Sequence, residues 1–231
     1  MKTLGLLGGM SWESSVEYER LINRAVRSRL GGTSSADLVI RSFNFAEIEA
    51  LQKAGKWAAA GDKLAEAAMG LEYCGADAIL ICANTMHLLA ERVQRDLGIP
   101  LIHIVDATGN AIAARGLTKV LLLGTLYTMQ KDFFKKRLAE NFGIEAVVPD
   151  EAEMHEVHRI IYNELVQGVF NESSKAYLLA LIDRLVYAGA QGVIAGCTEI
   201  ELLVKAEDVS VPYFATVQLH TAAAVKFALG E

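Results

Sequence analysis

Short apolar runs alternate along the chain with longer segments whose apolar residues recur at helical spacing. Segment 12–29 places Ile22 and Val26 near one helical face, and segments 63–73 and 153–167 follow the same spacing. Strands alternating with helices predict parallel sheets in an α/β fold that is doubly wound, of Rossmann or flavodoxin type. The β-rich runs predicted as strands are 3–7, 38–43, 78–82, 101–105, 119–123, 145–148, 192–195 and 211–214.

Two of these strands recur in the second half of the chain. Residues 5–10 resemble residues 121–126, and residues 79–85 resemble residues 193–199, at nearly the same separation. In the second pair, Ala83 aligns with Cys197. The repeat predicts two similar α/β domains related by pseudo-twofold symmetry, with domain boundaries at 1–98 plus 208–231 and at 99–207.

The ends of the repeated strands predict the place of the functional site. In open parallel sheets, ligands bind at the carboxyl ends of the strands. We therefore expect one active site in the cleft between the domains, where glycines and the N–H groups of following helices favour a carboxylate. Residues expected to contact the substrate there are Met10, Ser11, Asn84, Thr85, Thr125, Thr128, Thr198 and Glu199.

Cys197 is the candidate reactive group, because it ends a strand just before an expected helix start. The helix dipole can lower the pKa of a thiol in that position and give a thiolate that accepts a proton from carbon. The alternative is a small buried hydrophobic residue, as most free cysteines are. Asn84 and Thr85 offer hydrogen-bonding groups to a substrate, or cap a helix for local reasons. His87 is expected to be a packed or surface residue.

Composition narrows the class of function. The net charge of −6 without a basic run argues against nucleic acid as a partner, and no apolar run reaches the length of a membrane span. The N-terminus is interpreted as a strand rather than a signal peptide, and three cysteines suit a reducing cytoplasmic location. Cys74, Cys82 and His87 lack zinc-ligand spacing, and residues 5–9 lack the dinucleotide fingerprint, so neither a metal nor a cofactor is expected.

Three ordered motifs resemble those of the aspartate/glutamate racemase family. They are Gly-Gly-Met-Ser-Trp-Glu at 8–13, Asn-Thr-Met-His at 84–87 and Gly-Cys-Thr-Glu-Ile at 196–200. The likeness extends over essentially the whole chain and is strongest to the bacterial branch that includes broad-specificity amino-acid racemases. It implies racemisation or epimerisation of a small amino acid or dicarboxylate without pyridoxal phosphate, and a homodimer.

The resemblance also implies two acid/base groups, one on each face of the substrate α-carbon. The second maps onto Cys197, but the first maps onto Ala83, which cannot transfer a proton. Cys82 is adjacent, yet side chains alternate along a strand, so we expect it to point into the core. A water, Thr85 or another cleft residue remains as the second group, or Cys197 alone gives exchange without efficient inversion.

A second departure concerns specificity. Family members that act on aspartate carry an arginine and a lysine that hold the substrate carboxylates. The expected places of these two residues are occupied by Gln52 and by Val166 or Gln167. Because charge-assisted hydrogen bonds are the stronger ones, we expect a broad or uncharged amino-acid substrate.

Two other functions remain open. One is a single-thiol decarboxylase or isomerase of the same superfamily, which Ala83 favours. The other is a catalytically impaired protein that still binds amino acids.

Overall fold

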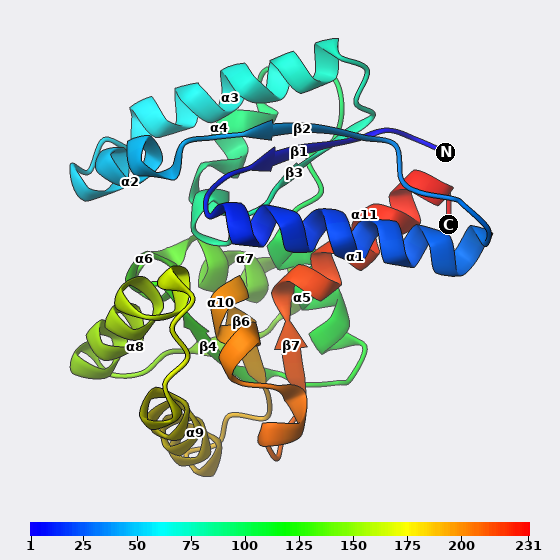
Figure 1. Cartoon of the computed structure of the whole chain (residues 1–231). Helices are drawn as coiled ribbons and strands as arrows, with labels where there is room; N and C mark the ends of the chain where they lie inside the picture. The colour runs from blue at the N-terminus through cyan, green and yellow to red at the C-terminus, as the bar shows by residue number, and fades with distance from the viewer. The chain divides into compact units, whose positions relative to one another are not determined.

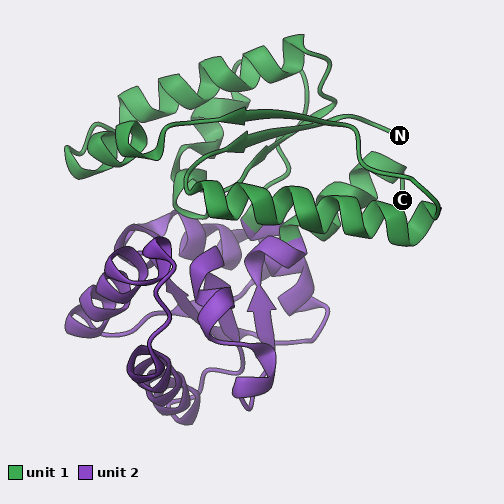
Figure 2. Ribbon diagram, in the orientation of Figure 1, with its two compact units in different colours: residues 1–104, 220–231 green, residues 105–219 purple.

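A computed structural model describes the whole chain, residues 1–231. The chain forms two compact units, residues 1–104 with 220–231 and residues 105–219 (Figure 2). The helices and strands of the two units are shown in Figure 1. None of the helices is long and apolar enough to serve as a membrane span.

The first unit is built on a sheet of three parallel strands in the order β2-β1-β3. Helices α1 and α3 lie on opposite faces of this sheet (Figure 1). The α3 face is apolar, since Leu7, Ile79 and Ile81 pack with Leu64 and Ala68. The elements are β1 (Leu4–Gly8), α1 (Trp12–Leu30), β2 (Leu38–Ser42), α2 (Phe45–Lys53), α3 (Trp57–Tyr73), β3 (Ala78–Ile81), η1 (Thr85–Leu89) and α4 (Ala90–Gln94).

The second unit contains a four-stranded parallel sheet in the order β5-β4-β6-β7. Its helix α8 begins at a capping box, in which Asp150 and Glu153 satisfy each other's backbone N–H groups. The elements are α5 (Ile104–Ala113), β4 (Lys119–Gly124), α6 (Leu126–Gln130), α7 (Asp132–Phe142), β5 (Glu145–Val147), α8 (Glu151–Asn163), η2 (Leu165–Gln167), α9 (Glu172–Tyr187), β6 (Val193–Gly196), α10 (Thr198–Leu203), η3 (Ala206–Asp208), β7 (Tyr213–Ala215) and α11 (Thr216–Leu229).

The predicted α/β fold with two parallel sheets is confirmed, and the repeat is visible in the strand order. β2-β1-β3 in the first unit and β5-β4-β6 in the second have the same parallel topology. The two repeated pairs of strands are therefore β1 with β4 and β3 with β6. The pseudo-twofold arrangement of the two halves stays a prediction.

The compact units divide later along the chain than the predicted domain boundaries after residues 98 and 207. The divisions fall after Ile104 and after Leu219. The later division, after Leu219, reflects strand pairing: β7 is hydrogen-bonded to β6 and so extends the sheet of the second unit. Only the C-terminal part of α11 belongs to the first unit, where the N–H of Lys2 donates to the carbonyl of Ala228 at 2.9 Å.

One predicted strand, 101–105, is wrong. Leu101 forms only an isolated bridge to Ile79, and α5 already begins at Ile104. The apolar run of residues 101–105 is too short for its periodicity to separate a buried strand from a buried helix start.

Two linked hydrogen bonds are buried in the interior of the first unit. The Tyr18 hydroxyl donates to Nδ1 of His220 at 2.7 Å, and Nε2 of His220 donates to the carbonyl of Ile102 at 2.7 Å. Both side chains are fully buried. Burial lowers the pKa of His220 to about 4 from its ordinary value of 6.5, although the bond to Ile102 opposes the shift. The ring is therefore neutral in the folded protein near neutral pH.

We predict that this histidine makes the fold sensitive to acid. Its folded pKa lies below its unfolded pKa, so its neutral state favours folding above pH 6.5, and this contribution is lost as pH falls from 6.5 towards 4. The loss amounts to about 3 kcal/mol. Urea unfolding at pH 7 and pH 4 checks it: His220→Gln should lose less stability than the wild type over this interval. The exposed His155→Gln is the control, and equal losses in all three proteins contradict the prediction.

Candidate functional site

The carboxyl end of β1 turns sharply into α1. Gly9 has φ of +83°, and a Cβ there would lie 2.3 Å from the carbonyl oxygen of Phe43, so glycine is required. The N–H of Gly9 donates to the hydroxyl of Ser15 at 2.6 Å. This turn buries Met10 at the end of the strand, among the apolar residues on the α3 face of the sheet.

Ser11 has a structural role in the same turn. It is the N-cap of α1, and its hydroxyl accepts a hydrogen bond from the N–H of Ser14 at 3.4 Å. The hydroxyls of Ser11 and Ser14 lie 3.2 Å apart. The geometry thus explains Ser11 by capping, and its predicted contact with substrate stays a prediction.

The carboxyl end of β3 presents Ala83, Asn84 and Thr85. Ala83 is half-buried, and Asn84 and Thr85 are buried. Asn84 precedes η1, but its side chain makes no capping hydrogen bond to that helix. Local capping therefore does not account for this asparagine.

Cys82 is poorly suited to accept a proton from a substrate, because its surroundings keep it protonated. It is fully buried, and burial raises the pKa of its thiol well above the ordinary range. It lies outside the apolar cluster on the α3 face, whereas its neighbour Ala83 packs against that cluster. The expected alternation of side chains explains the difference.

His87 ties the end of β3 to the start of α5. Its Nε2 accepts from the N–H of Ile104 at 3.2 Å, so Nδ1 carries the proton and donates to the carbonyl of Ala83 at 2.9 Å. The ring lies 4.7 Å from that of His103 and 5.5 Å from that of His220, measured between centroids. His87 is therefore buried and positions the backbone beside Asn84.

Gln52 lies at the end of α2 and is 4% exposed. Its Nε2 donates to the sulfur of Met86 at 3.0 Å, while its Oε1 has no hydrogen-bond partner. A buried acceptor left in this state costs about 1–3 kcal/mol. Met86 follows Asn84 and Thr85 directly, so this amide is next to the end of β3.

In the second unit, two glycines bring the ends of β4 and β6 together. Gly124 pairs with Gly196, and a Cβ on either would lie within 3.0 Å of the backbone of the other strand. Thr125 follows as the N-cap of α6, accepting from the N–H of Thr128 at 3.3 Å. Thr125 and Thr128 thus fix the loop beside Cys197.

Cys197 ends β6 with a charged partner. It is 7% exposed and belongs to the apolar cluster under α8 and α9, yet its thiol donates to Oε2 of Glu199 at 2.9 Å. Burial raises the pKa of the thiol well above its ordinary value, and the Glu199 charge raises it further. Backbone N–H groups of Glu199 and Ile200 lower it, as the sequence predicted, but they are outweighed. The expected lowered pKa is therefore wrong, and Cys197 is a thiol in this environment.

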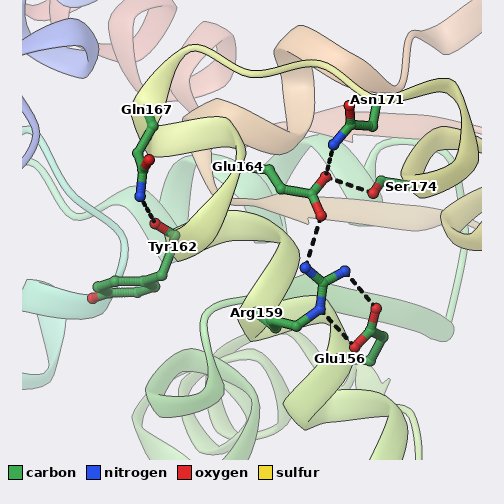
Figure 3. A network of polar contacts seen from close by, with 7 residues as sticks. All are labelled: Glu156, Arg159, Tyr162, Glu164, Gln167, Asn171 and Ser174. Atoms are coloured by element: carbon green, nitrogen blue, oxygen red, sulfur yellow. Dashed lines mark hydrogen bonds and ion pairs between the residues drawn. The ribbon is translucent and has the colours of Figure 1, made fainter.

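A carboxylate anchors the segment that follows α8 (Figure 3). Glu164 is 8% exposed and accepts from Arg159 at 2.8 Å, Asn171 at 2.9 Å and Ser174 at 2.6 Å. The Ser174 hydroxyl, above all, holds the pKa of Glu164 below its usual range. The anchored segment continues into η2, which packs against α10, the helix that carries Glu199.

No cation occupies the predicted lysine place in this segment. Val166 is half-buried against the apolar cluster, and Gln167 is exposed, donating to the carbonyl of Tyr162 at 3.4 Å (Figure 3). Thr198 is buried at the start of α10, beside Cys197.

The sequence did not predict the roles of His87, His158 or Glu164. Nδ1 of His158 accepts from the N–H of Leu126 at 3.2 Å, which fixes the start of α6. The i, i+4 spacing from Ala83 to His87 was a usable signal, since one helical turn separates them. The partners of His158 and Glu164 are distant in sequence or depend on loop geometry, and no local pattern reveals them.

Comparisons with known proteins give one consistent result. The family model described as Asp/Glu/hydantoin racemase matches residues 7–224. A crystal structure from Yersinia pestis assigned to the Asp/Glu racemases is 47% identical, with a TM-score of 0.94 over 99% of this chain and 100% of that one. An aspartate racemase homologue from Pyrococcus horikoshii is 38% identical, with a TM-score of 0.86 over 99% and 100% of the two chains. The broad-specificity amino-acid racemase RacX of Bacillus subtilis is 28% identical over 58% of this chain and 57% of its own.

We predict that His87→Ala destabilises the protein by about 2–4 kcal/mol, because the carbonyl of Ala83 and the N–H of Ile104 each lose a hydrogen bond. Urea unfolding at pH 7 measures the change. His155→Ala, at an exposed position, should change the unfolding free energy by less than about 0.5 kcal/mol. Equal effects of the two substitutions would show that the bonds of His87 contribute nothing to stability.

Proposed function

This chain belongs to the Asp/Glu/hydantoin racemase family, and we propose that it racemises or epimerises a small amino acid without pyridoxal phosphate. In this proposal Cys197 moves the α-proton, and Glu199 moves the proton of the thiol. The observation that carries the proposal is the 2.9 Å hydrogen bond between these two side chains at the carboxyl end of β6. Packing alone would not place a carboxylate beside a buried sulfur, because burying the charge of Glu199 is costly.

The raised pKa of Cys197 determines how the reaction begins. A thiol cannot remove a proton from carbon, so its own proton must first pass to Glu199, leaving a thiolate and a neutral carboxyl group. The thiolate then takes the α-hydrogen as a proton, and the electron pair of the C–H bond stays on the substrate as a carbanion. Protonation of this carbanion on the opposite face gives the other enantiomer, and protonation by Cys197 regenerates the starting one.

The opposite face lacks a thiol in this protein. Ala83 bears only a methyl group, and the pKa of Cys82 is raised by full burial. We propose that a water molecule or Thr85 supplies the proton on that face. Thr85 is a poor acid, so we expect exchange of the α-proton with solvent to be faster than inversion.

The proposed substrate is a broad range of amino acids or an uncharged one. Neither Gln52 nor the segment at Val166 and Gln167 offers a cation for a side-chain carboxylate. We propose that Met10, Asn84 and Thr85 of the first unit, with Thr125, Thr198 and Glu199 of the second, hold the same substrate as Cys197. The description of RacX as a broad-specificity racemase supports this range.

A single-thiol decarboxylase or isomerase is the second candidate, favoured by the alanine at position 83. Release of carbon dioxide from substituted malonates would support it, and inversion of an amino acid would argue for racemisation instead. A protein that binds amino acids without turnover is the third, and α-proton exchange above background excludes it. We further expect a homodimer in the cytoplasm, as the family resemblance implies.

We predict that Cys197→Ser lowers α-proton exchange by about 10²–10⁴-fold, the usual contribution of a general base. Incubation of single amino acids in heavy water, with deuterium and chirality read together, measures it. Substrate binding by calorimetry should persist in the variant. The exposed Cys74→Ser is the matched control and should exchange at the wild-type rate. The proposal is ruled out if Cys197→Ser still exchanges the α-proton at the wild-type rate. It is also ruled out if the wild type exchanges the α-proton of no amino acid.

We predict that Ala83→Cys raises racemisation by about 10²–10⁴-fold, because it restores a proton carrier on the second face. The ratio of inversion to deuterium incorporation should rise with it. Ala83→Ser adds a similar volume without a group that ionises near neutral pH, so it should change racemisation far less. If the cysteine and serine variants behave alike, position 83 does not face the α-carbon.

A further inference from the structure

Gln52 presents an acceptor that the fold itself does not use. Its side chain is 4% exposed, and Oε1 has no hydrogen-bond partner although Nε2 reaches the sulfur of Met86 at 3.0 Å. Native proteins leave few buried polar atoms in this state, and each one calls for an explanation such as a ligand or a water. The Met86 contact fixes one end of the amide and leaves the other end for a donor.

The Gln52 amide contacts an apolar cluster of the first unit through Met86. Met10, Ile48 and Met86 belong to the apolar cluster on the α3 face, and Ile48 lies one helical turn before Gln52. The nearest lysine in sequence, Lys53, is exposed and paired with Glu49 at 2.7 Å. A carboxylate beside Oε1 would meet a carbonyl dipole of the wrong sign, whereas a neutral donor would satisfy it.

The position of the amide connects it with the candidate site. Gln52 contacts Met86, which follows Asn84 and Thr85 at the end of β3, and Met10 at the end of β1 lies in the same cluster. A substrate bound at these two strand ends would therefore extend its side chain towards α2.

We propose that Gln52 is a specificity-determining residue, whose Oε1 accepts a hydrogen bond from a neutral donor on the substrate side chain. This inference rests on the proposed function and names its substrate class. Amino acids ending in a carboxamide or hydroxyl are preferred over the dicarboxylic ones. A water bound at Oε1 is the competing explanation, and it gives no preference between substrates.

Matched pairs of ligands test this, because asparagine and aspartate, or glutamine and glutamate, differ only in the terminal group. Calorimetry on the whole protein should give a Kd for asparagine at least about tenfold below that for aspartate, which corresponds to a single hydrogen bond. Gln52→Leu should bring the two values within about threefold of each other. Gln52→Arg should reverse the preference, since a guanidinium binds a carboxylate through two hydrogen bonds. The exposed Gln130→Leu is the matched control and should keep the wild-type ratio.

Several outcomes overturn the inference. These are aspartate binding as tightly as asparagine, Gln52→Leu weakening both ligands equally, and no binding by any of the four amino acids. Should Gln52→Leu fail to fold, Gln52→Met keeps the shape without the oxygen, and the wild-type ratio is decisive by itself. Binding does not depend on turnover, so the two hypotheses fail separately. A tenfold preference for asparagine over aspartate without α-proton exchange contradicts the proposed function only. Exchange without that preference contradicts only the role of Gln52.

Discussion

The hydrogen bond from the Cys197 thiol to the Glu199 carboxylate is the interaction on which the chemistry proposed for this protein depends. Cys197 follows β6 and Glu199 lies in the first turn of α10, two residues further along the chain, so no distant element is needed to pair them. The pair is held in place because Gly196 lets β6 approach β4, where any larger residue would meet the carbonyl of Leu123. A thiol beside a carboxylate shares one proton between two atoms, and the resting position of that proton is on sulfur.

Much of the fold could be predicted from the sequence, because the strands are short apolar runs between helical segments. The strand predicted at residues 101–105 is wrong, because an apolar stretch before a buried helix has the same pattern as a buried strand. β7 was predicted as a strand but placed in the wrong domain, since pairing with β6 is a tertiary choice that no local pattern records. Cys197 was correctly placed at the end of a strand. The direction of its pKa shift was not predicted, because burial depends on which residues pack around the sulfur.

The two units share a topology but differ in the chemistry at their strand ends. The second unit carries the thiol and the carboxylate, and the first carries buried neutral groups such as Asn84, Thr85 and Gln52. In the first unit, His87 and His220 make three hydrogen bonds to backbone groups, namely the carbonyls of Ala83 and Ile102 and the N–H of Ile104, rather than to ionised side chains. The repeated framework is thus compatible with two unequal halves, one with ionisable side chains after its strands and one with neutral polar side chains.

The anchoring of Glu164 has a consequence for how this protein can change over evolution. Arg159, Asn171 and Ser174 converge on one carboxylate, which sets the path of the chain between α8 and α9. The next residues, Val166 and Gln167, take no part in that convergence. Mutations at the exposed Gln167 can change the surface of this segment with little penalty to folding, so that surface can drift in a lineage while the scaffold stays constant.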